Sequence, residues 1–343
     1  MKKNHKISKA EYPVLMIGMT LILFLLILIA CGMGRYSISP FHVFQIIISQ
    51  IISTPETWDP QATGVVMTLR LPRIITAVLV GSAMALSGAA YQGVFKNPLV
   101  APDMLGVSSG ACVGASIGIL CNAGDFAIQA AAFAGGIAAV LVATSIPKVM
   151  KNNSMVMLVL AGIIVGGVLD SVMGLIKYLA DPDTQLAEIT HWQLGSLTKA
   201  VWEDVFYMGP PILLAITVLI AMRWRINILS LGESEAKTLG TDVRKTRGLV
   251  IVCATLLTAS SVCISGTIGW IGLVIPHFSR MLVGPDNRKI IPLSVILGAI
   301  FLLGIDTIAR VITSAEVPLS ILTGFVGAPF YFYLLLKQRM RLS

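Results

Sequence analysis

A series of long apolar runs constrains this chain more than any other feature. A helix that spans a bilayer needs roughly 20 apolar residues, because lipid offers no water to satisfy backbone polar groups. About ten runs in this sequence approach that length. They cover residues 13–33, 74–94, 104–121, 125–147, 154–176, 204–222, 247–265, 268–283, 291–312 and 319–337. We therefore predict an all-α integral membrane protein, a polytopic bundle that forms one transmembrane domain over residues 1–343.

Composition supports this class. The chain is 56% hydrophobic and 12% charged, whereas soluble domains carry about 25% charged residues. The net charge of +8 resides in short segments between apolar runs, which favours contact with membrane lipid and argues against nucleic acid. The five cysteines lie in or beside apolar runs without metal-site spacing, so we predict packing roles for them and no metal site.

The distribution of Lys and Arg predicts an orientation. Cytoplasmic loops of membrane proteins are enriched in these residues. With the N-terminus inside, most of the 25 Lys and Arg fall on the cytoplasmic side. The exceptions are Arg35, Arg70, Arg73, Lys177, Lys199 and Arg310. We therefore expect an even number of spans, with both termini cytoplasmic. The arginines on the outer side are exceptions to this rule, so we expect them to have a specific role.

Small residues recur every four positions in several runs. Glycines 106, 110, 114 and 118 are the longest such series, and Gly81–Ala85 and Gly162–Gly166 are shorter ones. In lipid, a face of small residues lets two helix backbones approach closely. Tight packing inside the bundle is the simpler interpretation, and close approach along a substrate path is the alternative.

The longest inner loop, residues 223–247, contains a predicted short helix that ends at Gly240. Such a helix can fit a groove in a cytoplasmic partner, or it can be a solvated connector. The chain contains no G-x-x-x-x-G-K-[ST] phosphate loop. If ATP drives transport, the ATPase is therefore a separate chain.

Several polar residues fall within the apolar runs. Asp170 is a candidate for a pathway or for a pair with Lys177. Ser108 and Ser109 lie in a G-x-S-x-G pattern, so an intramembrane serine protease that uses His277 is a remote alternative. A secondary transporter is a second alternative, but such proteins usually place several ionisable groups at the middle of the membrane.

Three stretches of the chain, in order, resemble the FecCD-type permeases of bacterial ABC importers. The first runs from Leu69-Arg70-Leu71-Pro72-Arg73 through Asn97-Pro98-Leu99 to Leu105-Gly106-Val107-Ser108-Ser109-Gly110. The second is the inner-loop segment from Leu231 to Gly240. The third runs from Gly266-Thr267-Ile268-Gly269-Trp270 through Pro276-His277, Asp306-Thr307-Ile308-Ala309-Arg310 and Glu316-Val317-Pro318-Leu319 to Gly327-Ala328-Pro329.

This resemblance implies the type II ABC importer permease fold, with ten helices in each subunit. It implies a second permease copy, identical or paired, and two ATP-binding cassette subunits that hold ATP and Mg, with no cofactor in this chain. It also implies an extracytoplasmic substrate-binding protein whose glutamates dock on Arg70, Arg73 and Arg310. A coupling segment at residues 229–245 would contact the ATPase through Leu231, Gly232, Glu233, Ala236, Leu239 and Gly240.

The residue chemistry fits this docking role, since an arginine fork suits a carboxylate. Asp306 lies four residues before Arg310, a helical spacing at which it could neutralise that arginine internally. The resemblance implies a transport permease, not an enzyme, in the bacterial cytoplasmic (inner) membrane. A bulky metal chelate is the expected cargo, an iron–siderophore first, with haem and cobalamin as alternatives. A pathway past Asp170, Ser108 and Ser109 is a further expectation.

Overall fold

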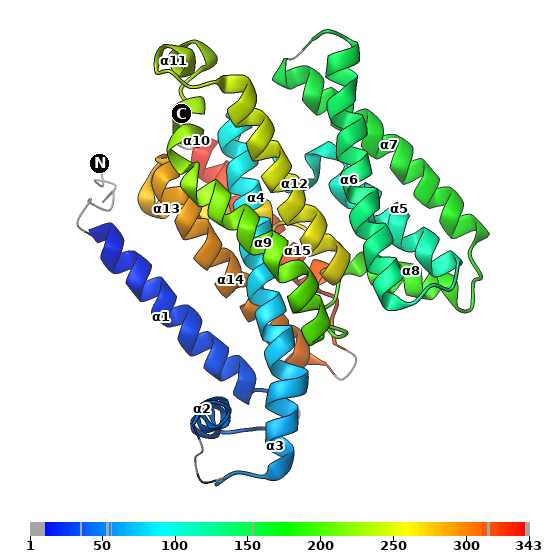
Figure 1. Ribbon diagram of the computed structural model, residues 1–343, viewed down its shortest axis with the longest axis vertical. Coiled ribbons are helices and arrows are strands. Elements are labelled where there is room, and N and C mark those ends of the chain that lie inside the picture. The colour runs from blue at the N-terminus through cyan, green and yellow to red at the C-terminus, as the bar shows by residue number, and fades with distance from the viewer. Residues whose placement is uncertain are drawn as a thin grey trace.

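The computed structural model describes residues 11–34, 36–52, 55, 57–152, 154–313 and 316–339. Each predicted apolar run contains a helix, which confirms the all-helical polytopic fold (Figure 1). Several residues used in the charge argument lie outside the described residues: Lys2, Lys3, Lys6, Lys9, Arg35 and Arg341. The side chains of Lys337 and Arg339 are likewise not described.

The ten helices that match the predicted runs are α1 (Glu11–Gly32), α4 (Leu71–Phe95), α5 (Val107–Leu120), α6 (Asp125–Val149), α7 (Met155–Leu179), α9 (Trp202–Ala221), α12 (Val243–Ser265), α13 (Ile271–Val283), α14 (Asn287–Ile312) and α15 (Leu319–Arg339). Between them lie α2 (Pro40–Ser49), α3 (Pro60–Gly64), the π-helix η1 (Val65–Arg70), the 3-10 helix η2 (Pro102–Leu105), α8 (Gln185–Leu194), α10 (Arg223–Leu229) and α11 (Glu233–Thr238). Within the described residues, seven helical segments are long and apolar enough to cross a membrane.

The predicted runs 104–121 and 268–283 are not continuous helices. In the first, Gly106 adopts φ +80° between η2 and α5. In the second, the chain is non-helical from Gly266 to Trp270, and α13 begins only at Ile271. Glycine adopts positive φ at little cost, whereas for tryptophan the φ of +71° at Trp270 is a genuine outlier. These breaks shorten α5 to 14 residues and α13 to 13.

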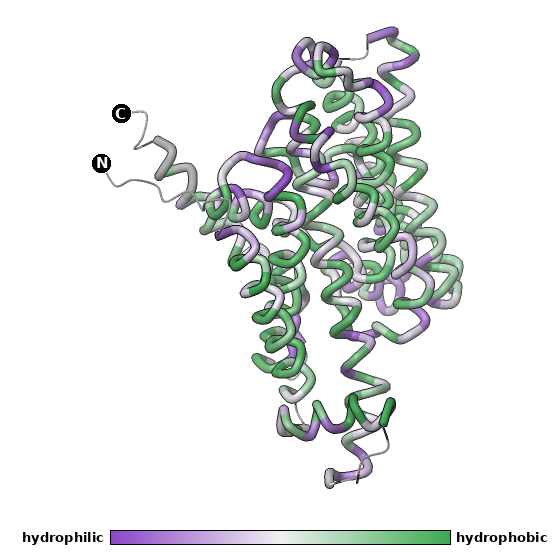
Figure 2. Tube along the Cα trace, turned by 60° about the vertical axis from the view of Figure 1, so that its left-hand side comes forward, coloured by the Kyte–Doolittle hydropathy of each residue, from purple (hydrophilic) through white to green (hydrophobic). Residues whose placement is uncertain are grey.

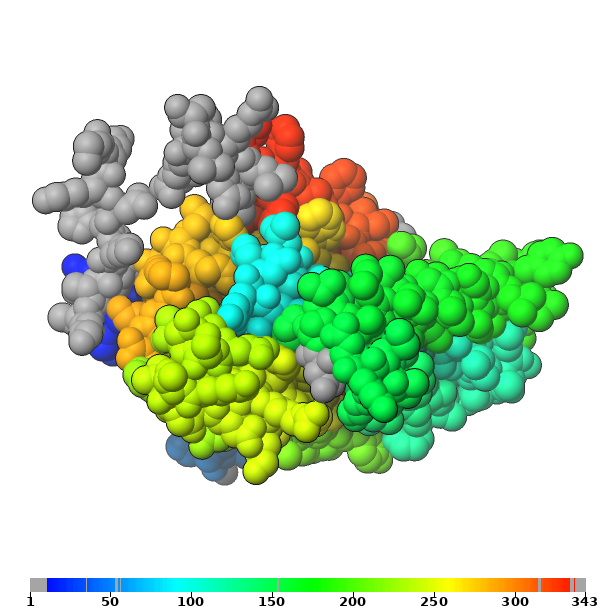
Figure 3. All heavy atoms as spheres, turned by 90° about the horizontal axis from the view of Figure 1, so that it is seen from above, coloured from blue at the N-terminus to red at the C-terminus, as the bar shows by residue number. Residues whose placement is uncertain are grey.

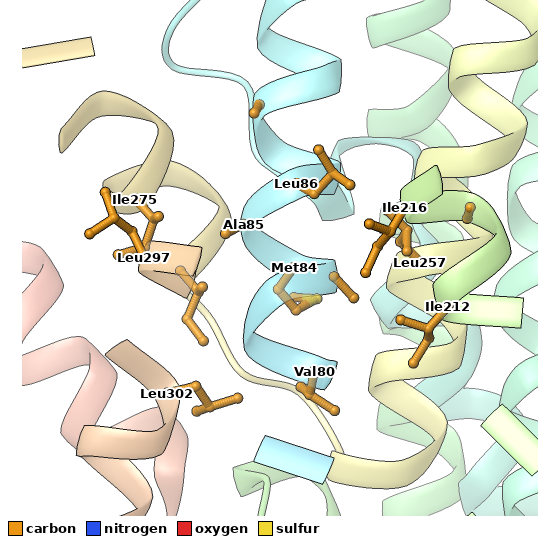
Figure 4. Close-up of a cluster of buried hydrophobic side chains, with 14 of the residues drawn as sticks. Val80, Met84, Ala85, Leu86, Ile212, Ile216, Leu257, Ile275, Leu297 and Leu302 are labelled. Carbon is orange, nitrogen blue, oxygen red and sulfur yellow. The ribbon is translucent and has the colours of Figure 1, made fainter. Parts of the chain in front are cut away.

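Helix α4 forms the centre of the bundle. In the apolar cluster of Figure 4, its side chains Val80 and Leu86 lie on the side of α9 and α12, and Ala85 lies on the side of α13 and α14. Gly81 faces Gly298 of α14 so closely that a β-carbon on either would collide with the backbone of the other. Small residues at this crossing therefore allow the two helix backbones to touch, as the glycine spacing predicted.

A second group of helices, α5 to α7, lies beside this centre (Figure 1). Gly110 and Gly114 of α5 contact the α6 backbone near Gly135 and Ala131. These contacts support the packing interpretation of the glycine series. A β-carbon at Gly166 of α7 would meet no atom within 4 Å, so this position leaves open space instead.

The two ends of the bundle carry different elements. Helix α11 stands at one end, on the side where α1 starts and α15 finishes, and α2 and α3 lie at the opposite end (Figure 1). Hydrophilic segments gather toward the helix ends, with apolar residues between them (Figure 2). Seen from the α11 end, the tip of α4 lies between the α10–α12 segment and the α6–α7 group (Figure 3). We refer to these as the α11 end and the α2 end.

Candidate functional site

Arg70 is the last residue of η1, at the α2 end, and its side chain is turned into the protein. It is 7% exposed. Its Nη1 donates to the carbonyl oxygens of Cys31 at 2.7 Å and Gly32 at 3.3 Å, and its Nη2 donates to that of Tyr36 at 2.5 Å. The last carbonyls of a helix have no partner within that helix, and cationic side chains often satisfy them. Arg70 therefore caps the end of α1.

Arg73 lies one turn further along, near the start of α4, and binds two carboxylates. Its Nε donates to Oδ1 and Oδ2 of Asp306 at 3.0 and 3.3 Å, and its Nη2 donates to Oδ1 at 2.8 Å. Its Nη1 and Nη2 donate to Oε1 and Oε2 of Glu316 at 3.2 and 2.9 Å. Both interactions are bidentate, an arrangement that adds strength and fixes orientation. Arg73 thereby joins α4 to α14 and to the segment that precedes α15.

Arg310 completes the cluster. Its Nε lies 3.2 Å from Oδ2 of Asp306, an ion pair without hydrogen-bond geometry, and its Nη2 donates to the carbonyl of Ala30 at 3.3 Å. The i,i+4 pair expected from the sequence is therefore present. Three arginines and two carboxylates leave one formal positive charge, and all three predicted docking residues also have interior partners. We call these five residues, Arg70, Arg73, Asp306, Arg310 and Glu316, the arginine cluster.

Sequence reasoning did not assign a role to Glu316, and it did not predict the pair between Arg73 and Asp306. The available signal was position, since Glu316 and Asp306 are predicted on the same side of the membrane as Arg73. Counting charges in this way predicts the side of the membrane on which a residue lies, but it does not predict the residue with which it forms an ion pair. Arg73 and Asp306 are separated by 233 residues in sequence, so only the packing of α4 on α14 brings them together.

The inner-loop helix predicted from Leu231 to Gly240 forms as α11, preceded by Gly232 and followed by Gly240, both at positive φ. Ala236 is buried against the bundle. Leu231 and Leu239 are 62% and 58% exposed, so their apolar side chains point away from it. This segment therefore offers apolar surface at the extreme α11 end (Figure 1).

A single ion pair fastens α11 to α12. Arg247 donates to the carboxylate of Glu233. This hydrogen bond and the charge of Arg247 lower the pKa of Glu233 below its ordinary value. The pair connects the first turn of the short helix to the first turns of α12.

Asp170 is exposed on α7, and Ser109 Oγ donates to its Oδ1 at 3.0 Å. Ser108, which precedes Ser109 in the sequence, is half-buried. The ion pairs of the described residues do not join Asp170 to Lys177. The surrounding glycines Gly166, Gly167 and Gly174 leave open space on the same helix. Asp170 is therefore an exposed carboxylate on a predicted membrane helix whose other exposed side chains are mostly apolar.

The protease alternative lacks its geometry. A nucleophile elbow needs a strand before the serine, whereas α5 follows the 3-10 helix η2. His277 has a buried Nδ1 without a hydrogen-bond partner and packs edge-on to Tyr331, with 6.5 Å between ring centroids. Among the described residues, no group of three or more His, Cys, Asp and Glu is placed to hold a metal ion.

Comparisons with known proteins place these features in context. The model of the FecCD transport family matches residues 21–337. The molybdate import permease MolB of Haemophilus influenzae is 38% identical over 329 residues, which cover 96% of this chain and 97% of MolB. The hemin transport permease HmuU of Yersinia pestis is 34% identical, and the match covers 96% of this chain and 98% of HmuU. The Fe(3+)-citrate import permease YfmE of Bacillus subtilis is 33% identical, with 98% of each covered.

A solved structure gives the same result at the level of the fold. An ABC transporter assigned to the metal-chelate type, in an inward-facing conformation, superposes with a TM-score of 0.85 at 37% identity. The match covers 95% of this chain and 99% of the other.

Proposed function

This chain belongs to the FecCD transport family of ABC importer permeases, and from that premise we propose that its cargo is a bulky metal chelate, an iron–siderophore first. It is a multi-pass, non-catalytic membrane subunit. The observation that carries this function is the match of the family over residues 21–337, together with a superposition that includes nearly the whole of another importer permease.

The relatives support an iron chelate and also a second candidate. HmuU and YfmE are named for hemin and for Fe(3+)-citrate, which are both iron chelates. MolB, which is named for molybdate, has the higher identity of the three. Molybdate is therefore a second candidate cargo, and cobalamin remains an alternative from the resemblance of the sequence. All of these cargoes would be delivered by a binding protein and driven by ATPase subunits.

We place the binding protein at the α2 end, on Arg70, Arg73 and Arg310. The convergence of three arginines on one region, with one formal positive charge remaining, supports this placement. Such a surface would orient an acidic partner and accelerate its encounter. The α2 end would then be extracytoplasmic, and the α11 end and both termini would be cytoplasmic, in a bacterial inner membrane.

We place the ATPase at the opposite end, on the coupling segment 229–245. The exposed Leu231 and Leu239 on either side of the buried Ala236 support this assignment. A helix that presents apolar side chains away from its own protein is suited to a groove in a partner. Gly232 and Gly240 set its limits, and Glu233 fastens it to α12, so that motion of the ATPase would be transmitted to a membrane helix.

We place the pathway along the uncovered face of α7, against a second permease copy. Asp170 bonded to Ser109, with Ser108 beside it, would be costly to expose to lipid. An aqueous path between two copies removes that cost. An identical partner is the simplest arrangement, because the face would then be completed by the same residues.

Uptake by right-side-out vesicles loaded with ATP tests the proposal. We expect labelled iron–siderophore to enter only when ATP, the ATPase and the binding protein are present. Labelled molybdate, haem and cobalamin are tested in the same way, and the compound that is taken up under these conditions identifies the cargo. Uptake that persists without the ATPase and collapses with the proton gradient would instead indicate a secondary transporter.

Charge reversal tests docking. Replacing both Arg70 and Arg73 with Glu should weaken binding of the delivery protein, and reversal of that protein's glutamates should restore it. Because both arginines also have interior partners, the double variant should melt at a lower temperature than wild type, so binding is measured at a temperature at which thermal unfolding shows the variant to be folded. Normal docking by a folded double variant would reject the assignment.

A further inference from the structure

Arg73 holds two carboxylates of very different burial. The side chain of Asp306 is fully buried, whereas that of Glu316 is 30% exposed. Asp306 belongs to the regular helix α14, and Glu316 belongs to the connection between α14 and α15. The two ion pairs are therefore unequal, because water screens and competes with the Glu316 pair and not with the Asp306 pair.

The backbone of Glu316 is also unusual. Its φ is +52°, in the left-handed region that non-glycine residues seldom adopt. Such conformations persist when the surrounding contacts impose them, and they occur often at binding and switching sites. Among the described residues, the hydrogen bonds of the Glu316 side chain go to Arg73. That contact therefore helps to hold Glu316 in this conformation.

The guanidinium of Arg73 has no edge left for another carboxylate. A guanidinium can bind a carboxylate with two parallel hydrogen bonds along its Nε–Nη edge or along its Nη1–Nη2 edge. Asp306 occupies the first edge and Glu316 occupies the second. A docking carboxylate can bind Arg73 in this way only if one of the two leaves, and Glu316 is the one that solvent reaches.

We propose that Glu316 occupies on Arg73 the place of a carboxylate of the delivery protein, so that docking proceeds by exchange. The incoming carboxylate replaces Glu316 on the Nη1–Nη2 edge, and Asp306 keeps Arg73 in position. This inference rests on the proposed docking function. It adds two points to that function. Glu316 competes with the incoming carboxylate and so sets the affinity of docking, and its release is a means by which docking changes the permease.

The released segment leads directly to two other elements. Three residues after Glu316, the backbone N–H of Leu319 donates to the carbonyl of Gly195 at 3.0 Å. Leu319 begins α15, and Gly195 directly follows α8. Exchange at Arg73 thus acts on the start of α15 and on the end of α8 through one short stretch of chain. Docking would reach both helices without any contact between them and the delivery protein.

The experiment measures binding of the importer's own substrate-binding protein to the permease–ATPase complex in lipid nanodiscs, without nucleotide. Glu316→Gln removes the competing charge. Glu316→Asp retains the charge but shortens its reach, so it separates exchange from general repulsion of an acidic partner. Glu203→Gln is the matched control, because Glu203 is an exposed acid at the same end of the bundle that does not contact Arg73.

We expect both Glu316 variants to bind the delivery protein about two- to fivefold more tightly than wild type, the range of a partly exposed ion pair. Their affinity should also fall more steeply with salt, since docking then gains an ion pair instead of exchanging one. Glu203→Gln should match wild type. Without the delivery protein, phenylglyoxal should modify Arg73 faster in both Glu316 variants than in wild type.

Wild-type docking with unchanged or weaker affinity in both Glu316 variants would overturn the exchange and leave the docking function intact. Tighter binding by the Gln variants at 316 and 203 alike, without tighter binding by Glu316→Asp, would show general repulsion and would also overturn it. Failure of the wild-type complex to bind the delivery protein at all would reject the docking function, and the exchange with it.

Discussion

Arg73 on α4 and Asp306 on α14 form a buried ion pair in which Nη2 lies 2.8 Å from Oδ1. The same carboxylate lies 3.2 Å from Nε of Arg310. One fully buried acid therefore compensates two arginines, and it does so at the end of the bundle where α1, α4 and α14 meet. The arginine cluster, on which the delivery protein is proposed to dock, therefore also holds α1, α4 and α14 together.

Replacing Asp306 with Asn should destabilise the permease strongly. The substitution leaves Arg73 and Arg310 without their shared buried charge, and loss of one partner of a buried ion pair costs about 3–5 kcal/mol. Thermal unfolding of the purified protein in detergent measures the loss. Combining Asp306→Asn with Arg73→Gln should cost less than the two single changes added together. Additive losses would show that the two side chains do not interact.

Replacing Gly298 with Ala should also destabilise the protein, because the new methyl group would collide with the backbone of Gly81. Overpacking of this kind costs about 1–3 kcal/mol. Gly304 provides the control on the same helix, since a β-carbon there meets nothing within 4 Å. We expect Gly304→Ala to melt at or above the wild-type temperature. Equal effects of the two substitutions would contradict a close crossing of α4 and α14.

Replacing Arg70 with Ala should loosen the end of α1. The carbonyl groups of Cys31 and Tyr36 lose the donor that Arg70 provides, whereas that of Gly32 keeps the N–H of Ile38. An unsatisfied buried polar group costs about 1–3 kcal/mol. Hydrogen exchange should accelerate at the end of α1 and remain unchanged at the end of α7. Arg70→Lys should restore only part of the protection, because a single ammonium cannot reproduce the arginine fork. Full protection in Arg70→Ala would exclude the capping role.

The attachment of α11 should weaken in acid. Arg247 lowers the pKa of Glu233 relative to the unfolded chain. The pair therefore stabilises the folded state at pH values above the ordinary pKa of Glu, about 4.3. That contribution is lost as the pH falls through the lowered pKa of the folded state. Protease cleavage near α11 should therefore be constant from neutral pH down to about pH 5 and rise below the ordinary Glu range. Glu233→Gln should remove this dependence and be cleaved readily at every pH.

Replacing Asp170 with Asn should reduce transport without affecting folding. Asp170 is exposed, and within the described part of the chain its hydrogen bond joins it to Ser109, so little stability depends on its charge. ATP-driven uptake should fall while the melting temperature stays at the wild-type value. Ser109→Ala removes the hydrogen bond but keeps the carboxylate, and it should have the smaller effect on uptake. Wild-type uptake by Asp170→Asn would remove Asp170 from the pathway.

The fold was largely predictable because each element depends on local chemistry. Apolar runs of membrane length must be helices, whatever their neighbours, since backbone groups in lipid must be satisfied within the segment. The glycine spacing in 106–118 likewise predicted a close helix contact, and Gly110 and Gly114 make one. The breaks at Gly106 and from Gly266 to Trp270 were not predicted, because an apolar stretch has the same composition whether or not its helix is interrupted.

The sequence by itself determined the all-helical membrane class, the ten apolar runs in which helices form, and the family. It did so because hydrophobicity, charge and motif order are properties of residues and of their neighbours along the chain. Only the tertiary structure decided that Arg70 caps α1 and that Arg73 is shared by Asp306 and Glu316. A long arginine side chain can reach partners in many directions, and the partner it binds depends on which helices pack beside it.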